Sequence, residues 1–252
     1  MRFSQLEKLL TGIKNSYKNK YIMAGHKKLN IIFDIDETLI SYTRMSDIED
    51  LDDEKQNEYI VIKDETSNPP CGYVVRPNVP KIFDFVMGNC ATLNLWTKSS
   101  KPYANRLAAG FMKLNPRWKF ANVWADDDAE EASEENGCSK DLNYIWYTLE
   151  KFKPCDTILI DDLKENVGNE CNFHNGIQVP TFDSLSGDVN DSAMIKVIDK
   201  IKQVIAKSDF CAKGELPFPF PNATQKNVTR VGFSGGRKTR RRKGKKSRRR
   251  KA

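Results

Sequence analysis

The sequence predicts an α/β fold in which helices cover both faces of a parallel sheet. Three short segments, at 29–33, 91–96 and 157–160, consist mainly of apolar residues, which is typical of strands buried on both faces. Segments with apolar residues three or four positions apart lie between them, such as 79–87 and 101–114, and this spacing predicts helices. A chain of 252 residues accommodates one such three-layer α/β/α domain with short extensions.

The remaining elements follow from the same patterns. Residues 58–63 and 72–75 alternate, and the turn sequence Asn68-Pro69-Pro70 lies between them, which predicts a small β-hairpin inserted into the domain. No large cap domain is expected. Further elements are expected at 118–124 (strand), 141–152 (helix) and within 189–207 (helix).

The net charge of +7 is distributed unevenly along the chain. Residues 237–252 contain twelve Lys or Arg and no acidic residue, and residues 1–30 contain seven basic residues and one Glu. Residues 31–236 hold the remaining 22 basic and 33 acidic residues, a net charge of −11. The sequence therefore predicts an acidic body between two basic ends.

Composition argues against several classes of protein. No run of 18 apolar residues is present, so no transmembrane helix is expected. The first 30 residues lack the apolar core of a secretory signal, so we expect an intracellular protein. The cysteines lack the C-x-x-C spacing of a structural zinc site, and in a reducing compartment all six are expected to be free thiols. They are Cys71, Cys90, Cys138, Cys155, Cys171 and Cys211.

Polar residues follow the three apolar strands, at Asp34, Thr97 and Asp161. Ligands of parallel α/β sheets bind at the carboxyl ends of the strands, so we expect these side chains to lie close together. Asp36 places a second carboxylate two residues after Asp34. Charge beside a buried strand is costly unless a cation or a substrate uses it. The sequence therefore predicts a functional site at this edge of the sheet.

The motifs at these positions resemble those of the haloacid-dehalogenase superfamily, whose members transfer phosphoryl groups through an aspartate nucleophile. The closer resemblance is to phosphatases that act on the carboxy-terminal domain (CTD) of RNA polymerase II, including the small CTD phosphatases and NLI-interacting-factor-like proteins. It covers roughly residues 29–207 and implies a haloacid-dehalogenase-like (Rossmannoid) fold. The matching motifs are Asp34-Ile35-Asp36-Glu37-Thr38-Leu39, Val75-Arg76-Pro77-Asn78, Leu95-Trp96-Thr97-Lys98-Ser99, Lys140-Asp141-Leu142 and Ile160-Asp161-Asp162.

The resemblance implies a role for each of four catalytic residues. Asp34 is expected to attack phosphorus and form an aspartyl-phosphate. Asp36 is expected to protonate the leaving alcohol and then to deprotonate water. Thr97 is expected to donate a hydrogen bond to a phosphoryl oxygen, and Lys140 to neutralise the nucleophile and the developing charge. The expected substrate contacts are Thr38, Thr97, Ser99 and Lys140.

Magnesium is the expected cofactor, because a carboxylate that attacks a phosphate dianion meets charge repulsion. The side chains of Asp34 and Asp162 and the backbone carbonyl of Asp36 are the expected ligands, and Mg²⁺ prefers such hard oxygen atoms. Asp161 is expected either to orient Lys140 or to help hold the metal.

The leading hypothesis for function is a Mg²⁺-dependent phosphoprotein phosphatase that acts on Ser and Thr phosphates, because a site without a large cap accommodates a peptide. One alternative is a polynucleotide 3′-phosphatase. Another is a non-catalytic phosphate-binding adaptor tethered to nucleic acid, although both carboxylates of the first motif are present. We interpret Arg76 as a structural ion-pair partner rather than a catalytic residue.

Residues 126–135 contain seven acidic residues in ten positions. One interpretation is a solvated, mobile loop. The other is a patch that favours basic peptide substrates and repels polyanions.

The two ends of the chain are expected to differ in structure. Residues 1–28 predict a basic amphipathic helix, which either packs on the domain of residues 29–212 or meets a membrane surface or partner. Residues 213–236 predict a Pro- and Gly-rich linker. Residues 237–252 predict a disordered tail that binds nucleic acid non-specifically or a nuclear-import receptor. A nuclear or nucleic-acid-associated protein is therefore expected, and the tail resembles in composition those of large DNA virus proteins.

Overall fold

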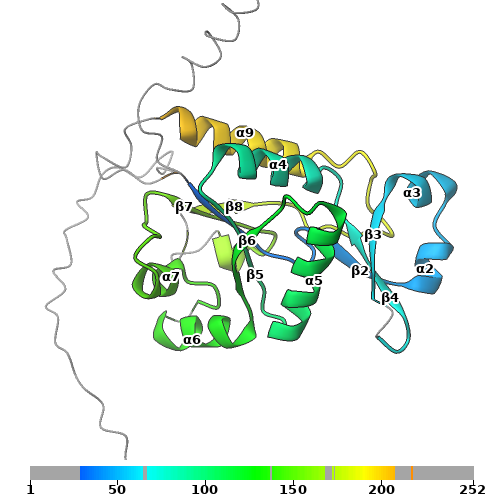
Figure 1. Cartoon of the computed structure of the whole chain (residues 1–252), viewed down its shortest axis with the longest axis horizontal. Coiled ribbons are helices and arrows are strands. Elements are labelled where there is room, and N and C mark those ends of the chain that lie inside the picture. Colours follow the sequence, from blue (N-terminus) through cyan, green and yellow to red (C-terminus); the bar gives the residue numbers. More distant parts are fainter. Residues whose placement is uncertain are drawn as a thin grey trace, which may run out of the picture. The chain divides into compact units, whose positions relative to one another are not determined.

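A computed structural model of the chain (Figure 1) describes residues 29–64, 67–136, 138–167, 172, 174–207 and 217. The helix expected within residues 1–28 and the basic tail at 237–252 lie outside the described residues, as does the expected linker apart from Pro217. These expectations, and the domain limits derived from them, stay predictions.

The described residues contain a five-stranded parallel sheet with the strand order β6-β5-β1-β7-β8. The strands are β1 (Asn30–Phe33), β5 (Thr92–Trp96), β6 (Phe120–Trp124), β7 (Thr157–Asp161) and β8 (Gly176–Gln178). β1 lies in the middle, and Phe33 at its end is in register with Leu95 of β5 and Ile160 of β7. The predicted parallel sheet is confirmed, and the carboxyl ends of its three apolar strands lie side by side.

Helices cover both faces of this sheet (Figure 1). They are α4 (Val79–Asn89), α5 (Lys101–Leu114), α6 (Asp126–Asn136), α7 (Leu142–Thr148), α8 (Lys164–Val167) and α9 (Ala193–Ala206). Ile31 and Phe33 of β1 join a hydrophobic cluster with α4, α5 and α9, whereas Ile32 joins a second cluster with α7. Because successive side chains of a strand point to opposite faces, the two clusters form the two sides of the predicted α/β/α arrangement. No described helix is long and apolar enough to cross a membrane.

The insert is an antiparallel sheet of β2 (Ile40–Arg44), β4 (Cys71–Val75) and β3 (Ile60–Asp64), in that order. Two short helices, α2 (Met45–Glu49) and α3 (Asp53–Glu58), connect β2 to β3. The expected pairing of β3 with β4 is confirmed, but the insert is a three-stranded sheet rather than a hairpin. β2 escaped detection because it is short and a helix begins directly after it, with no turn residues to mark its end.

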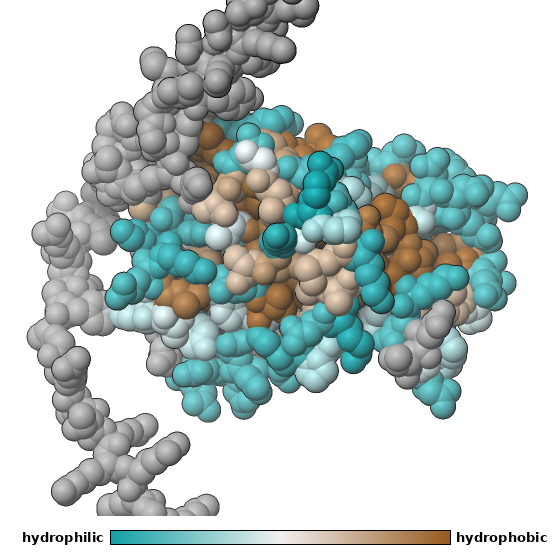
Figure 2. Space-filling model, viewed as in Figure 1, coloured by the Kyte–Doolittle hydropathy of each residue, from teal (hydrophilic) through white to brown (hydrophobic). Residues whose placement is uncertain are grey.

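The insert packs on α5 through hydrophobic residues, which gather in Figure 2 where β3 meets this helix. A Cβ atom on Gly110 of α5 would lie 2.6 Å from Cγ2 of Ile62 in β3. A larger residue than glycine would therefore require the side chain of Ile62, or the insert that carries it, to shift.

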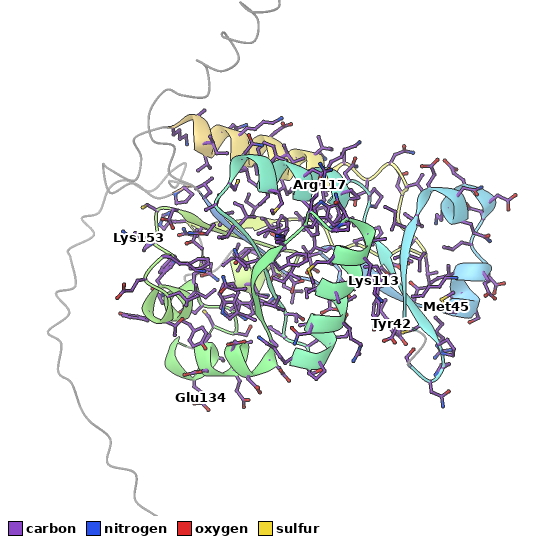
Figure 3. The ribbon with its side chains drawn as sticks, viewed as in Figure 1. Tyr42, Met45, Lys113, Arg117, Glu134 and Lys153 are labelled. Atoms are coloured by element: carbon purple, nitrogen blue, oxygen red, sulfur yellow. The ribbon has the colours of Figure 1, made fainter. Side chains whose placement is uncertain are left out.

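The acidic segment forms helix α6, so its interpretation as a mobile loop is wrong. Ala129 and Ala132 are buried, and a carboxylate oxygen of Asp128 accepts a hydrogen bond from the backbone N–H of Ala125 at 2.9 Å. Negative charge in a first turn is also favoured by the helix dipole. The side chains of Asp127, Glu130, Glu131 and Glu134 are exposed, and Figure 3 shows Glu134 on the outer side of the helix. The preference of this face for basic peptides stays a prediction.

The cysteines correct a second expectation, because Cys138 and Cys155 are disulfide-bonded. Cys71 and Cys90 are free thiols, as expected. Free thiols were expected because the sequence lacks zinc-site spacing and a secretory signal. Neither observation shows which cysteines the fold brings within disulfide distance.

Candidate active site

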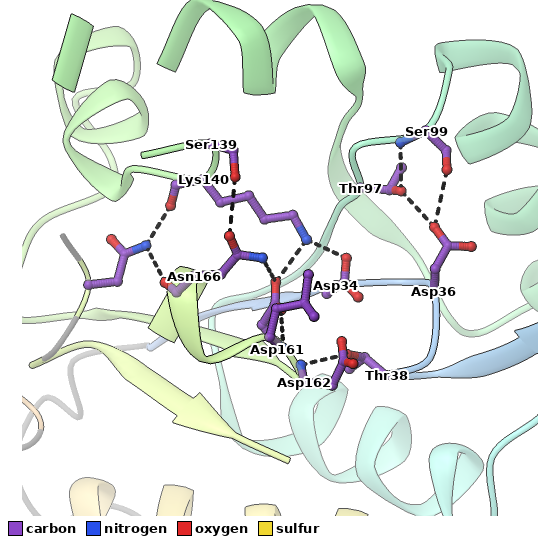
Figure 4. Close-up of polar contacts among 12 residues, drawn as sticks. Asp34, Asp36, Thr38, Thr97, Ser99, Ser139, Lys140, Asp161, Asp162 and Asn166 are labelled. Atoms are coloured by element: carbon purple, nitrogen blue, oxygen red, sulfur yellow. Dashed lines mark hydrogen bonds and ion pairs between the residues drawn. The ribbon is translucent and has the colours of Figure 1, made fainter. Parts of the chain in front are cut away.

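The site lies at the carboxyl ends of β1, β5 and β7 (Figure 4). Asp34 follows β1, and its backbone N–H donates to the carbonyl of Ile160 in β7 at 2.8 Å. Thr97 follows β5, and its backbone N–H donates to the carbonyl of Trp124 in β6 at 3.2 Å. Asp161 is the last residue of β7. Sheet pairing thus fixes the backbone of the three residues that were predicted from their place at the carboxyl ends of the strands.

A tight turn after β1 holds the first motif. The N–H of Leu39 donates to the carbonyl of Ile35 at 2.9 Å, and the N–H of Phe182 donates to the carbonyl of Glu37 at 2.7 Å. Glu37 has a φ of 59°, in the left-handed region that a residue with a Cβ rarely adopts. The turn lets Asp34 and Asp36 line one pocket of about 220 Å³.

Lys140 enters this pocket from the loop before α7. Its ammonium donates to Oδ1 of Asp34 and, at 2.8 Å, to Oδ2 of Asp161. Burial alone would lower the pKa of Lys140, but the charges of Asp34 and Asp161 and their hydrogen bonds raise it above its usual value. Lys140 therefore stays positively charged.

Burial raises the pKa of Asp34 to about 7. The Lys140 ammonium works against this shift, and the neighbouring charges of Asp161 and Asp36 add to it. A carboxylate that is taken out of water is destabilised and reactive unless a cation compensates it.

The charges at this edge of the sheet fit a divalent cation. Oxygen atoms of Asp34, Asp161 and Asp162 lie within 4.8 Å of one another, and all three side chains are buried. Within the described part of the chain, only Lys140 forms an ion pair with these three carboxylates. Two buried negative charges therefore lack a compensating cation, and hard carboxylate oxygens at this spacing suit a metal such as Mg²⁺.

The hydrogen bonds of the two aspartates at the end of β7 differ. Oδ1 of Asp161 accepts the N–H of Leu163 at 2.8 Å, and Oδ2 accepts Lys140 and, at 2.9 Å, the side-chain amide of Asn166. Asp162 accepts one hydroxyl on each oxygen, Thr181 on Oδ2 at 2.9 Å and Thr38 on Oδ1 at 3.2 Å. Asp161 is therefore engaged mainly in orienting Lys140, and Asp162 keeps more capacity for a metal.

The carboxyl group of Asp36 lies among hydroxyl groups rather than among the other carboxylates. Its Oδ2 accepts the hydroxyls of Thr97 at 2.9 Å and of Ser99 at 3.2 Å, and its Oδ1 accepts the phenol of Tyr103. The site thus separates two kinds of carboxylate, of which Asp34 lies beside a cation and Asp36 lies beside neutral donors. This is the division of labour that a nucleophile and a proton carrier need.

Comparison with known proteins identifies the family. The model of the NLI interacting factor-like phosphatase family matches residues 29–211, which is most of the chain. The chain belongs to this family. The expectation of a haloacid-dehalogenase-type phosphatase related to the CTD phosphatases is thereby confirmed.

A viral protein is one relative of this NLI interacting factor-like phosphatase. It is the putative CTD phosphatase-like protein 355R of Invertebrate iridescent virus 6, which is 28% identical over 184 residues, or 70% of this chain and 96% of that protein.

Two solved structures of Fcp1, an RNA polymerase II CTD phosphatase, are also similar. The first is 16% identical with a TM-score of 0.46 over 81% of this chain. The second, a fission yeast variant bound to beryllium fluoride, is 14% identical with a TM-score of 0.45 over 79% of this chain. The chain covers 59% and 58% of these two longer proteins.

Thr38 differs from its expected role as a substrate contact. Its side chain is fully buried and does not line the pocket. Its hydroxyl donates to Oδ1 of Asp162 at 3.2 Å and accepts the N–H of Asp162 at 3.0 Å. Thr38 therefore positions a carboxylate of the phosphatase.

Three residues of the site were not identified from the sequence. Asn166 bonds both Asp161 and the hydroxyl of Ser139, and Asn172 donates to the backbone carbonyls of Lys140 and Asn166. Tyr103 reaches Asp36 from α5. The sequence offered one signal for two of them, which is closeness along the chain to a polar strand end. Asn166 follows Asp161 by five positions, and Tyr103 follows Thr97 by six.

Arg76 is confirmed as a structural ion-pair partner. Its Nε donates to Oδ2 of Asp191 at 2.7 Å, and its Nη1 donates to the carbonyl of Thr38 at 3.2 Å. Arg76 thus ties the end of the insert to the first motif of the phosphatase.

Proposed function

We propose that this phosphatase hydrolyses phosphoserine and phosphothreonine esters of proteins through an aspartyl-phosphate on Asp34. One observation carries the proposal: a buried carboxylate, Asp34, lies in contact with Lys140 in a pocket that also contains Asp36 and Thr97. This supplies a nucleophile, a charge-neutralising cation, a proton carrier and a hydrogen-bond donor to the phosphate within one small volume.

In the first half-reaction, an oxygen of Asp34 bonds to phosphorus as the bond between phosphorus and the ester oxygen breaks. Asp36 gives its proton to that ester oxygen, so that the product leaves as a neutral alcohol. Lys140 and the hydroxyl of Thr97 stabilise the negative charge on the nucleophile and the phosphoryl oxygens.

In the second half-reaction, a water molecule attacks the aspartyl-phosphate. Asp36 takes the proton of this water, and the bond between Asp34 and phosphorus breaks to release inorganic phosphate. Asp161 keeps Lys140 in place through both steps, because it accepts a hydrogen bond from the ammonium at 2.8 Å.

A divalent cation, proposed to be Mg²⁺, would be held by the carboxylates of Asp34 and Asp162 and the backbone carbonyl of Asp36. Asp161 would instead hold the ammonium of Lys140. When bound, it supplies the positive charge that offsets repulsion between a carboxylate and a phosphate dianion.

The surroundings of the pocket support a protein substrate. Glu37, Lys98 and Leu163 line the pocket and are exposed, so the pocket reaches the surface. A serine or threonine phosphate on a peptide can enter from that side, and the viral relative is named for similarity to phosphatases of a protein domain.

One experiment tests the substrate and the nucleophile together. Purified protein with Mg²⁺ is assayed against a phosphoserine heptad peptide, a 3′-phosphorylated oligonucleotide and 4-nitrophenyl phosphate. We expect turnover of the peptide, complete loss in Asp34→Asn, and no change in Asp199→Asn, whose carboxylate is exposed on α9. Turnover of the oligonucleotide but not of the peptide would favour the polynucleotide 3′-phosphatase, and no turnover of any substrate would favour the adaptor.

We also propose that the basic tail holds the phosphatase on nucleic acid or carries it to a nuclear-import receptor. Twelve positive charges in residues 237–252 bind polyanions through counterion release, and the iridescent-virus relative supports the expected viral origin. Deletion of 237–252 should abolish salt-sensitive retention on DNA without changing turnover of 4-nitrophenyl phosphate. Equal loss of both would contradict this proposal.

A further inference from the structure

Both oxygen atoms of Asp36 accept hydrogen bonds, but from different sides. Oδ2 accepts Thr97 at 2.9 Å and Ser99 at 3.2 Å, and Thr97 lines the pocket. Oδ1 accepts the phenol of Tyr103, which does not line the pocket. Figure 4 shows Oδ2 directed toward Thr97 and Ser99 and the second oxygen directed away from them. The carboxyl group therefore has a front oxygen and a back oxygen.

The donor at the back oxygen is itself held in place. Tyr103 lies in the first turn of α5, and its ring meets that of Tyr73 edge-on at 5.7 Å between centroids. The phenol of Tyr103 donates to Oδ1 of Asp36, and a phenol with its ordinary pKa of about 10 keeps its proton at neutral pH. A hydroxyl donor to a carboxylate forms one of the stronger hydrogen bonds in proteins.

Substrate binding changes the hydrogen bonds of the front oxygen, Oδ2. A carboxylate has about four lone-pair sites, two on each oxygen, and Thr97 and Ser99 occupy both sites on Oδ2. When a phosphoryl oxygen takes the hydroxyl of Thr97, one site on Oδ2 becomes available. The bond from Tyr103 persists, because its phenol lies outside the pocket.

We propose that Tyr103 is a positioning residue, which anchors Oδ1 of Asp36 so that Oδ2 carries the proton in both half-reactions. The inference rests on the proposed function. In the first half-reaction, the proton on Oδ2 passes to the ester oxygen as the ester bond breaks and the bond from Asp34 to phosphorus forms. In the second, Oδ2 takes a proton from water as its oxygen bonds to phosphorus and the bond from Asp34 breaks.

The test compares Tyr103→Phe with Tyr73→Phe. Each change removes one phenol hydroxyl from a packed ring, but the hydroxyl of Tyr73 donates to Asp64 at 3.3 Å rather than to Asp36. On the phosphoserine peptide, kcat of Tyr103→Phe should fall roughly 10- to 100-fold, less than the roughly 10²- to 10⁴-fold contribution of the general acid itself, with KM changed less than about twofold. Tyr73→Phe should keep the wild-type kcat, and both variants should melt within a few degrees of the wild type.

The leaving group separates a positioning role from general damage. Nitrophenolate leaves without a proton, so Tyr103→Phe should form the aspartyl-phosphate from 4-nitrophenyl phosphate at the wild-type rate. It should then hydrolyse it slowly, because that step still needs Asp36. Stopped-flow measurement should therefore show a larger burst of nitrophenolate than in the wild type. A loss without a larger burst would overturn the proposal, as would a Tyr103→Phe enzyme that matches Tyr73→Phe.

A double-mutant cycle completes the test. In the Asp36→Asn background, Tyr103→Phe should cause no further loss of peptide turnover, because Tyr103 acts only through the proton carrier that Asp36→Asn has already removed. Losses that multiply would overturn the proposal. A wild-type enzyme inactive on the peptide contradicts the proposed substrate alone, and the burst with 4-nitrophenyl phosphate then still decides the role of Tyr103.

Discussion

Lys140 forms an ion pair with Asp34, although the two residues are 106 positions apart in the chain. The two side chains are 2% and 8% exposed, so the pair exists only in the folded protein and largely without water. It links the loop before α7 to the end of β1, and Lys140 also pairs with Asp161 at the end of β7. The same contact therefore bears on stability and on the reactivity of the nucleophile.

Replacement of Lys140 by methionine should damage both properties. Breaking a buried ion pair leaves uncompensated carboxylates, so the free energy of unfolding should fall by about 3 kcal/mol, and kcat should fall by about 10²- to 10³-fold. The matched control is Lys202→Met, since Lys202 pairs with Asp199 at 3.1 Å on the exposed surface of α9. That change should alter stability by less than about 0.5 kcal/mol. Urea unfolding and steady-state kinetics measure the two effects, and a fully active Lys140→Met enzyme would contradict the assigned role.

Mg²⁺ should stabilise the folded protein through the carboxylates at the site. A ligand that binds only the folded state adds about 2.7 kcal/mol at a concentration 100-fold above its dissociation constant. In a thermal-shift titration, Asp162→Asn should need at least about tenfold more Mg²⁺ than the wild type for the same rise in melting temperature. Loss even of a group that supports a metal ligand typically lowers metal affinity by about 10- to 100-fold. Asp199→Asn should titrate as the wild type does. Equal Mg²⁺ responses in all three proteins would exclude Asp162 as a ligand.

The strand ends of the site were predictable because apolar strands are easy to recognise and end abruptly. Asp34, Thr97 and Asp161 each follow a segment that is mainly apolar, and parallel pairing then brings them together. Lys140 followed from its motif. The sequence did not identify β2, since a short alternating segment without flanking turn residues carries little signal.

Tyr103 shows why the remaining residues were missed. At helical spacing it belongs to the apolar stripe of α5 together with Leu107 and Phe111, and its ring does pack in the core. Its hydroxyl reaches Asp36 only because α5 begins at Lys101, shortly after the end of β5 at Trp96. The acidic residues of α6 likewise predicted exposure but not a helix, because helix formation there depends on the burial of Ala129 and Ala132. Contacts between elements of the fold determine both the role of Tyr103 and the helix at the acidic segment. The periodicity of the sequence does not reveal such contacts.

The pKa of Asp34 predicts how the stability of the metal-free protein depends on pH. Burial raises this pKa from 3.8 to about 7. A raised carboxyl pKa means that the folded state binds the proton more tightly, so its contribution is complete below about pH 4 and is lost as the pH rises through about 7. Between these values the wild type should lose up to about 4 kcal/mol relative to Asp34→Asn. Urea unfolding in a chelator measures the difference, and a difference independent of pH would contradict the shift.

Arg76 should be irreplaceable even by lysine. Its guanidinium bonds Asp191 at 2.7 Å, donates to the carbonyl of Thr38 at 3.2 Å and lies 5.4 Å from the ring centre of Phe182. A lysine ammonium cannot reproduce this planar set of contacts, so Arg76→Lys should lower the free energy of unfolding by about 2–4 kcal/mol. Because Thr38 holds Asp162, the affinity for Mg²⁺ should weaken as well. Arg106→Lys is the matched control, since Arg106 is half exposed and pairs with Asp64 at 3.5 Å. If the two variants are equally stable, the buried contacts of Arg76 do not hold the insert to the first motif.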